Sequence, residues 1–304
     1  MIWEVPGVSV GHWSDRTART GCTAILFDPP VVASGEVRGA APATREFALL
    51  DPMASVQRID AVVLSGGSAF GLAAAHGAME WCEAHDRGFP TSAGRVPIVV
   101  GMSLFDLAVG DASVRPDAGS GRAACEAAPQ EVLGDVGAGT GCTVGKWRGA
   151  EAAVAGGLVG AVQRRDDLVV AALVAVNPWG DVVGTGSHHL PHPEVSLVDE
   201  GGGAEDLGVA EPGAGELDVD DPAGTNTTIG VVVTNAVLDK VGCHHVARAA
   251  HDGLARAITP PHSSVDGDAF VAAATCEVLA HPDPVRLLAL TAVDRAIRSL
   301  GSDR

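Results

Sequence analysis

Apolar residues occur in short uninterrupted runs that recur along most of this chain. Val-rich runs at 61–64 and 96–100 predict two strands. Longer runs at 168–176 and 229–234 contain almost no charged residue, so we expect both to be strands buried on two faces. Strands of this kind need a covering layer on each side.

Ala-rich stretches between and after these runs predict the helices. Residues 71–85 (GLAAAHGAMEWCEAH) predict one helix, and residues 239–258 predict another directly after the last strand. A turn at 260–268 (PPHSSVDGD) follows. Two further apolar segments then predict helices, one ending near Leu279 and one over 284–300. The pattern as a whole indicates an α/β protein of layered sheets and helices.

Residues 191–226 differ from everything around them. Ten acidic residues lie between positions 194 and 221, with three consecutive glycines at 201–203. Such a segment has too little apolar surface to offset its ordering entropy, so we expect a solvated, flexible loop. It stops at Thr227, where a buried strand is predicted to begin.

Composition narrows the functional class. The formal charge of −18 disfavours binding to nucleic acid or to anionic membranes. The six cysteines are scattered without a C-x-x-C pair, which is typical of reduced thiols in a cytoplasmic protein. No run approaches the roughly 18 apolar residues of a membrane span. We therefore expect a cytoplasmic protein that binds neither nucleic acid nor membrane.

The Gly-rich stretch at 137–146 (GAGTGCTVGK) fails as a phosphate loop. Trp147 stands where a Walker A loop has its magnesium-binding Ser or Thr, and Cys142 replaces the third glycine of a dinucleotide fingerprint. The alternative function of this stretch is a Gly-rich wall that lets the backbone approach a substrate. Its candidate substrate-binding residues are Gly139, Gly141 and Lys146.

A second Gly-rich motif, SGGSAFG, surrounds Ser68. A nucleophile elbow requires a glycine two residues after the serine, where this chain has Phe70. Ser68 is therefore expected to cap the following helix. The functional alternative is that Gly67 and Ser68 present the free amides of a helix N-terminus to a substrate.

Histidines and carboxylates raise the question of a metal. His188, His189 and His192 form a cluster at the edge of the acidic segment without a Glu or Cys at helical spacing, and the adjacent His244 and His245 point apart on a helix. We expect no metal and no cofactor.

Asp266 and Asp268 flank a single glycine. The sequence lacks the remaining ligands of a calcium loop, so the minimal interpretation is a turn with two carboxylates. Two such groups also suit a cationic amine, which they can hold through charge-assisted hydrogen bonds.

The junction between Asn226 and Thr227 offers a specific chemistry. A hydroxyl at the tip of a rigid strand can attack the preceding carbonyl in an N-to-O acyl shift, and hydrolysis of that ester leaves Thr227 as a new N-terminus. An N-terminal Thr carries its own base, because the ordinary pKa of an α-amine is about 7.7 to 8.0. The alternative is an ordinary Thr pair that favours a strand.

Eight segments in order resemble the DmpA-like L-aminopeptidase/D-esterase family of self-processing peptidases, over nearly the whole chain. They are GVSVGH, TGCTAILF, VRGAAPATRE, LSGGSAFGLAAA, VGAGTGCTVGK, VAVNPWGD, TNTTIGVVVTNA and HSSVDGDAF.

The resemblance implies a four-layer αββα sandwich formed by one domain, residues 1–304. It implies a single cut between Asn226 and Thr227, giving a large chain of 1–226 and a small chain of 227–304. Thr227 rather than Thr228 is the implied nucleophile, because it lies seven residues before the T-N-A triplet at 234–236. Family members assemble further, so a homo-oligomer of processed heterodimers, a tetramer or larger, is expected.

Three more site residues follow from the resemblance. Asn177 matches the side-chain amide that donates to the oxyanion, and Asp266 and Asp268 match the polar pair that binds the amine of the nucleophile. Some members have a Tyr after the Gly-rich stretch; this chain has no Tyr, and Gly145 stands at that position.

The implied activity is hydrolysis of small peptides, amides or esters by an aminopeptidase or amidase, through an acyl-enzyme on Thr227. Two alternatives stay open at this point. One is acyl transfer, as in the ornithine acetyltransferases, which share the fold type and self-cleavage at Thr. The other is an unprocessed binding protein without activity.

Overall fold

The computed structural model describes residues 1–184 and 226–301. The predicted flexible segment at 191–226 lies almost wholly outside the described residues. The principal strands are β1 Val8–Asp15, β2 Thr20–Val37, β3 Ala43–Arg45, β4 Arg58–Ser65, β7 Val99–Ser103, β10 Gly157–Arg165, β11 Leu168–Val176, β13 Ile229–Ala236 and β15 Ala269–Val278. The principal helices are α1 Ser68–Gly71, α2 Ala74–Ala84, α3 Ala118–Glu126, α4 Lys240–Ala257 and α5 Pro282–Arg298.

Short elements complete the described chain. The minor strands are β5 Phe89–Thr91, β6 Gly94–Val96, β8 Thr143–Val144, β9 Val154–Ala155, β12 Asp181–Val182 and β14 Ile258–Thr259. The 3₁₀ turns include η1 Ile2–Glu4, η2 Phe47–Leu50, η3 Gly137–Gly139, η4 Lys146–Arg148, η5 Ala150–Ala152 and η7 Ser299–Gly301.

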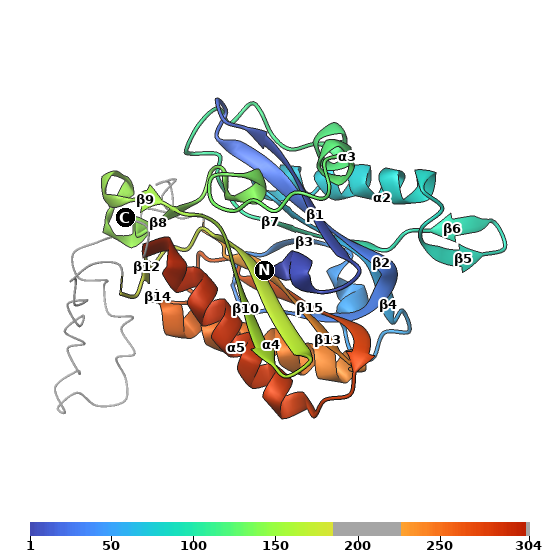
Figure 1. Ribbon diagram of the computed structural model, residues 1–304. Helices are drawn as coiled ribbons and strands as arrows, with labels where there is room; N and C mark the ends of the chain where they lie inside the picture. The colour runs from blue at the N-terminus through green and yellow to red at the C-terminus, as the bar shows by residue number, and fades with distance from the viewer. Residues whose placement is uncertain (185–225, 302–304) are drawn as a thin grey trace, which may run out of the picture.

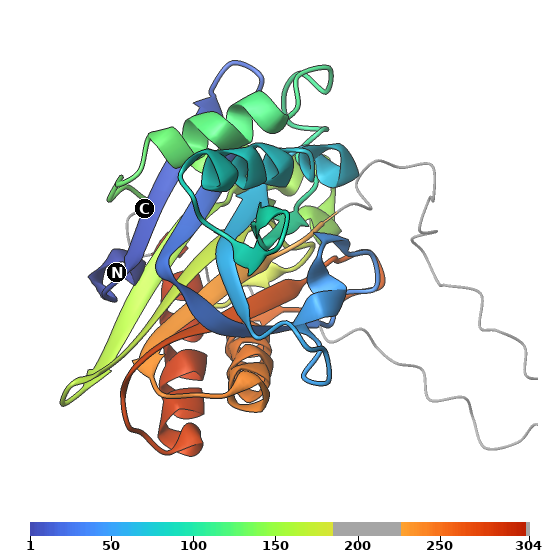
Figure 2. The same ribbon diagram turned by 90° about the vertical axis from the view of Figure 1, so that its right-hand side faces the viewer.

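The long strand β2 takes part in both halves of the sheet. One half contains β10, β11, β13 and β15, and the other contains β1, β4, β7 and β3. The hydrogen-bonded order is β10-β11-β13-β15-β2-β4-β7-β3, with β1 also paired to β2. The first part of β2 pairs with β1 and β4, whereas its last part pairs with β15. The register with β4 shifts between Leu26 and Val31, where the strand bends from one half to the other. The two halves therefore pack face to face as two layers (Figure 2).

Alternation along each strand divides the apolar residues among three cores. In β11, Ala171 and Leu173 face the core between the two sheet layers, while Ala172 and Val174 face α4 and α5. In β4, alternate residues face the inter-sheet core and the core beneath α2 and α3. A strand that buries both faces explains why its sequence is an uninterrupted apolar run.

Helices cover both outer faces of the sheet layers. Figure 1 shows α2 and α3 on one side and α4 and α5 on the other, with the strands between them. Three apolar cores between four layers confirm the expected αββα sandwich. Within the described residues, no helix is long and apolar enough to cross a membrane.

The structure confirms most predicted elements and corrects one. The strands at 61–64, 168–176 and 229–234 and the helices at 71–85, 239–258 and 284–300 are present within a few residues. The predicted helix ending near Leu279 is wrong, because this segment is β15. It lies between β13 and β2, buried on both faces along most of its length, and an apolar run buried all round looks alike as helix or strand.

Candidate active site

Strand pairing brings three distant segments to one edge of the sheet. β13 runs parallel to β15 with Ile229 opposite Ala269, and antiparallel to β11 with Ala175 opposite Ile229. The residues just before β13, those just before β15 and those just after β11 must therefore meet. They contain Asn226 to Thr228, Asp266 to Asp268 and Asn177.

Thr227 lies at the centre of this edge and is 4% exposed. Its Oγ1 donates to the carbonyl oxygen of Asn226, and its backbone N–H donates to the carbonyl oxygen of Asn177 at 3.0 Å. The Asn226 oxygen also accepts from the backbone N–H of Gly267 at 2.9 Å. The carbonyl at the expected cleavage site is thus held between a hydroxyl and an amide donor.

Gly267 is a glycine because the backbone of Ala41 and the hydroxyl of Thr227 approach it closely. A Cβ at this position would lie 2.8 Å from Thr227 Oγ1 and 2.5 Å from the carbonyl oxygen of Ala41. Both distances are shorter than real Cβ contacts. The glycine between the two acids therefore leaves room for the hydroxyl of Thr227.

Asp266 and Asp268 are each 1% exposed but have separate partners. Asp266 accepts from the N–H of Trp179 at 3.1 Å and from the N–H and hydroxyl of Ser263 at 3.0 and 2.5 Å. Burial raises the pKa of Asp266 above its ordinary value, and the neighbouring Asp268 carboxylate raises it further.

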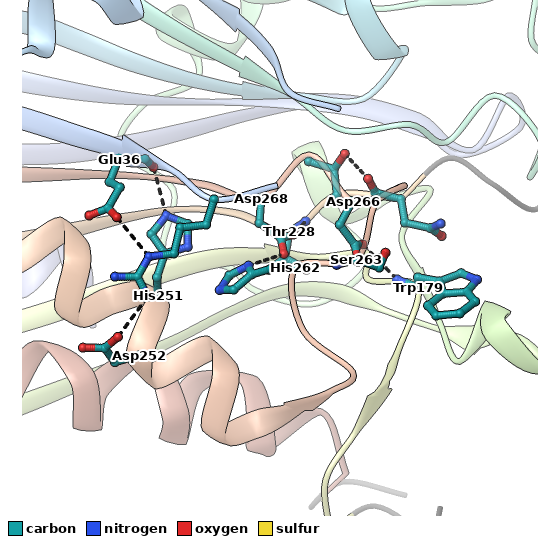
Figure 3. Close-up of polar contacts among 12 residues, drawn as sticks. Glu36, Trp179, Thr228, His251, Asp252, His262, Ser263, Asp266 and Asp268 are labelled. Carbon is teal, nitrogen blue, oxygen red and sulfur yellow. Dashed lines mark hydrogen bonds and ion pairs between the residues drawn. The ribbon is translucent and has the colours of Figure 1, made fainter. Parts of the chain in front are cut away.

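Asp268 is hydrogen bonded directly to the residue that follows Thr227. Its Oδ1 accepts from the backbone N–H of Thr228 at 2.7 Å, and its Oδ2 accepts from His262 Nδ1 at 2.8 Å. Figure 3 shows Thr228, Asp268 and His262 as one connected group, next to the group formed by Trp179, Ser263 and Asp266.

Lys146 and Asn177 form the opposite wall. The Nζ of Lys146 donates to the carbonyl oxygen of Thr143 at 2.9 Å, and to the carbonyl oxygen and Oδ1 of Asn177 at 3.1 and 2.8 Å. Burial lowers the pKa of Lys146 to about 7, against opposing contributions from Cys142 and Asp266. The carbonyl oxygen of Asn177 thus accepts from both Lys146 Nζ and the backbone N–H of Thr227.

The side chain of Asn177 is fully buried and fixed in orientation. Its Oδ1 accepts from Lys146 and from the N–H of Thr143 at 2.9 Å, and its Nδ2 donates to the carbonyl oxygen of Phe105 at 2.8 Å. An amide group has two N–H bonds, and among the described residues Nδ2 has this one acceptor, so its second N–H can donate to another group.

The other candidate binding residues have contacts within the protein. Gly67 and Ser68 use their backbone N–H groups on Asp106 Oδ1 at 2.7 Å and Leu104 O at 2.9 Å. The prediction that Ser68 caps the helix is wrong, because Gly67 is the N-cap and the cap has no side-chain hydrogen bond.

Gly139 and Gly141 are required by packing against this chain's own backbone. A Cβ would lie 2.2 Å from Leu158 N at the first position and 2.2 Å from Arg19 O at the second. Of the five candidate substrate-binding residues, Lys146 is the one that hydrogen bonds to a residue contacting Thr227.

The histidine cluster considered as a metal site cannot be compared with the structure. His188, His189 and His192 lie outside the described residues. Among the residues that the structure describes, no group of three or more His, Cys, Asp or Glu side chains is arranged to hold a metal ion.

Sequence reasoning missed His262, Ser263 and the backbone N–H of Gly267. All three lie in the motif HSSVDGDAF, so their proximity to the two acids was visible in the sequence. Their roles were not, because a loop that folds back on its own carboxylates leaves no periodic signal.

A threonine hydroxyl against a carbonyl, with buried carboxylates and a buried amine around it, defines a site suited to acyl transfer onto a hydroxyl group. The sequence model of peptidase family S58 matches residues 1–301. An uncharacterized aminopeptidase of Mycobacterium leprae is 44% identical over 291 residues, covering 90% of this chain and 78% of the relative. The protein therefore belongs to peptidase family S58 and is a hydrolase.

More distant relatives and solved structures agree with this class. The 6-aminohexanoate-oligomer endohydrolase of Paenarthrobacter ureafaciens is 29% identical over 91% of this chain and 76% of that protein. A Burkholderia sp. β-aminopeptidase superposes with a TM-score of 0.69 at 21% identity, covering 98% of this chain and 84% of the other. The L-aminopeptidase D-Ala-esterase/amidase of Ochrobactrum anthropi gives a TM-score of 0.68 at 20% identity, with the same two coverages of 98% and 84%. These two structures establish the fold.

Proposed function

We propose that this protein is a self-processing aminopeptidase or amidase that cleaves itself between Asn226 and Thr227 and then uses Thr227 as its nucleophile. The observation that carries the proposal is the geometry at the scissile carbonyl. Thr227 Oγ1 contacts the carbonyl of Asn226, whose oxygen also accepts a backbone hydrogen bond from Gly267.

Self-cleavage follows in two balanced steps. Thr227 Oγ1 forms a bond to the carbonyl carbon of Asn226 and gives up its proton, while the Gly267 N–H stabilises the oxyanion. The C–N bond then breaks, the nitrogen of Thr227 takes the proton, and an ester remains. Water hydrolyses the ester, which leaves a carboxylate on Asn226 and a free α-amine on Thr227.

The same groups support turnover of a substrate. The α-amine of Thr227 takes the proton from Oγ1 as the hydroxyl attacks the acyl carbon, and returns it to the leaving amine. The remaining N–H of Asn177 Nδ2 donates to the oxyanion. Asp266 and Asp268 balance the charge of the amine, and water finally releases the acyl group from Thr227.

The substrate class is small peptides, amides or esters. The names of the relatives support amide hydrolysis, since two are an aminopeptidase and an oligomer endohydrolase. We further propose a cytoplasmic protein that assembles as a homo-oligomer, a tetramer or larger, of processed heterodimers. Fractionation and light scattering test these two points.

The decisive experiment is the intact mass of the purified protein under denaturing conditions. Cleavage before Thr227 gives pieces of about 22.8 and 7.8 kDa, in proportion to the residues on each side of the cut in a chain of 304 residues and 30.6 kDa. Thr227→Ala should remain a single 30.6-kDa chain without activity, whereas the matched Thr228→Ala should still be cut. An active, cleaved Thr227→Ala would contradict the assignment. An intact wild-type chain would favour the binding-protein alternative.

A further inference from the structure

His262 begins the loop that carries both site acids, and its backbone has an unusual conformation. Its φ of 51° lies in the left-handed region, which a non-glycine residue adopts at a free-energy cost. This conformation places Nδ1 2.8 Å from Asp268 Oδ2. The imidazole side chain is 17% exposed and the Asp268 side chain 2% exposed.

The proton of this hydrogen bond belongs to the histidine. An ionised carboxylate only accepts, so Nδ1 carries the hydrogen. Nε2 is buried and has no hydrogen-bond partner among the described residues. The bond to Asp268 is therefore the only one that orients the ring within the described part of the chain.

Asp268 connects His262 to the segment of the nucleophile. Its second oxygen accepts from the N–H of Thr228, the residue bonded to Thr227. Each carboxylate oxygen thus has one side-chain or backbone donor, and the two donors fix its plane. Asp266 has an independent set of donors, Ser263 and Trp179, and makes no hydrogen bond with His262.

The charged and titratable surroundings of the pair come from several elements. His251 of α4 packs against His262 with ring centroids 5.0 Å apart; burial lowers its pKa to about 4, so it is neutral near pH 7. His251 donates to the carbonyl oxygen of Glu36 in β2 (Figure 3).

Further charged groups complete this environment. Arg38, which follows β2, is paired with Glu36 and Asp252. Asp266 lies in the same loop, and Lys146 lies near Asp266.

We infer that His262 is a positioning residue for the nucleophile: its Nδ1–H holds the Asp268 carboxylate directed at the Thr228 amide, and so fixes Thr227. This inference rests on the proposed role of Thr227. Loss of this donor leaves one oxygen of Asp268 without its hydrogen bond, so the carboxylate no longer has the two donors that fix its plane at the Thr228 amide.

The test compares His262→Gly with His262→Asn. Both residues tolerate a left-handed backbone, but Asn alone restores an N–H donor at the same number of bonds from Cα as Nδ1. In the processed protein, kcat of the Gly variant should fall about 10- to 100-fold, the equivalent of one hydrogen bond to a charged group. KM should change little, because His262 is expected to act on the position of Thr227 and not on substrate binding. Asn should largely restore kcat.

The outcomes separate this inference from the proposed function. An uncut wild-type chain, or an active Thr227→Ala, defeats the proposed function itself. A cleaved, active wild type whose Gly and Asn variants share the same kcat overturns the role of His262 alone. If the Gly variant fails to fold, His262→Asp replaces it, because Asp has the shape of Asn without a donor. Equal activity of the Asn and Asp variants would then overturn the inference.

Discussion

Two lysines place their amino groups among oxygen acceptors in different regions of the molecule. Lys146 in η4 donates to Thr143 O and to two oxygens of Asn177. Lys240, the first residue of α4, is 2% exposed and donates to Leu49 O, Ala54 O and Val56 O at 2.6, 3.1 and 2.6 Å. Burial lowers the pKa of both lysines.

The two regions differ in whether another group donates to the same oxygen acceptors as the lysine. The carbonyl oxygen of Asn177 also accepts from Thr227 N–H, so Lys146 is one bond removed from the proposed nucleophile. The acceptors of Lys240 belong to one segment, residues 49–56, which this lysine joins to α4. Burial of a cation thus does not by itself point to a chemical role in this protein; the acceptor that Lys146 shares with Thr227 is the feature that makes it the candidate.

Of the two lysine replacements, Lys146→Met should have the larger effect on activity. The change removes the amino group beside Asn177 and Thr227, so kcat/KM for an amino-acid anilide should fall about 100-fold or more. Lys240→Met is the matched control and should keep its activity within about threefold, as expected for a change outside the site. Comparable losses in the two variants would remove the functional distinction between the regions.

The effects of the two replacements on stability should have the opposite order, with the larger loss for Lys240→Met. Lys240→Met leaves three carbonyl oxygens without their charged donor and should lower the free energy of unfolding by about 2 to 4 kcal/mol. Lys146→Met should cost less, because Asn177 O keeps its bond from Thr227, and Asn177 Oδ1 keeps its bond from Thr143. Urea denaturation in a Thr227→Ala background keeps one chain and measures both. A larger loss at Lys146 would contradict the comparison.

Per pH unit, the smallest expected effect is a pH dependence of stability. The pKa of Lys146 is lowered from 10.5 to about 7 in the folded protein. Between these values the unfolded chain binds more protons than the folded one, so the free energy of unfolding should rise with pH. For one proton the slope is at most about 1.4 kcal/mol per pH unit. Subtracting the profile of Lys146→Met isolates this slope, and identical profiles from pH 7 to 9 would exclude it.

The fold was largely predictable because its strands are buried on two faces. Uninterrupted apolar runs identified β11 and β13, and the Ala-rich pattern identified α2 and α4. The same uniformity concealed β15, whose sequence AFVAAATCEV has neither a helical nor an alternating period. Its neighbours β13 and β2 decide that it is a strand, and a sequence pattern contains no information on neighbours.

The site was predictable as a set of residue types rather than as an arrangement. Thr227, Asn177, Asp266 and Asp268 were all named from motifs, and the structure brings them to one sheet edge. The hydrogen bonds that Ser263 and His262 make with these acids depend on the fold of their loop and were not predicted.

The sequence by itself determined which segments are buried and which motifs are candidates for the chemistry, because both depend on the identity of neighbouring residues along the chain. Tertiary structure decided which of those motifs meet. The Thr228 amide and the Asp268 carboxylate are 40 residues apart in the chain, and they meet because β13 and β15 pair in parallel with Ile229 opposite Ala269. Strand register is a property of two segments at once, and neither segment encodes it alone.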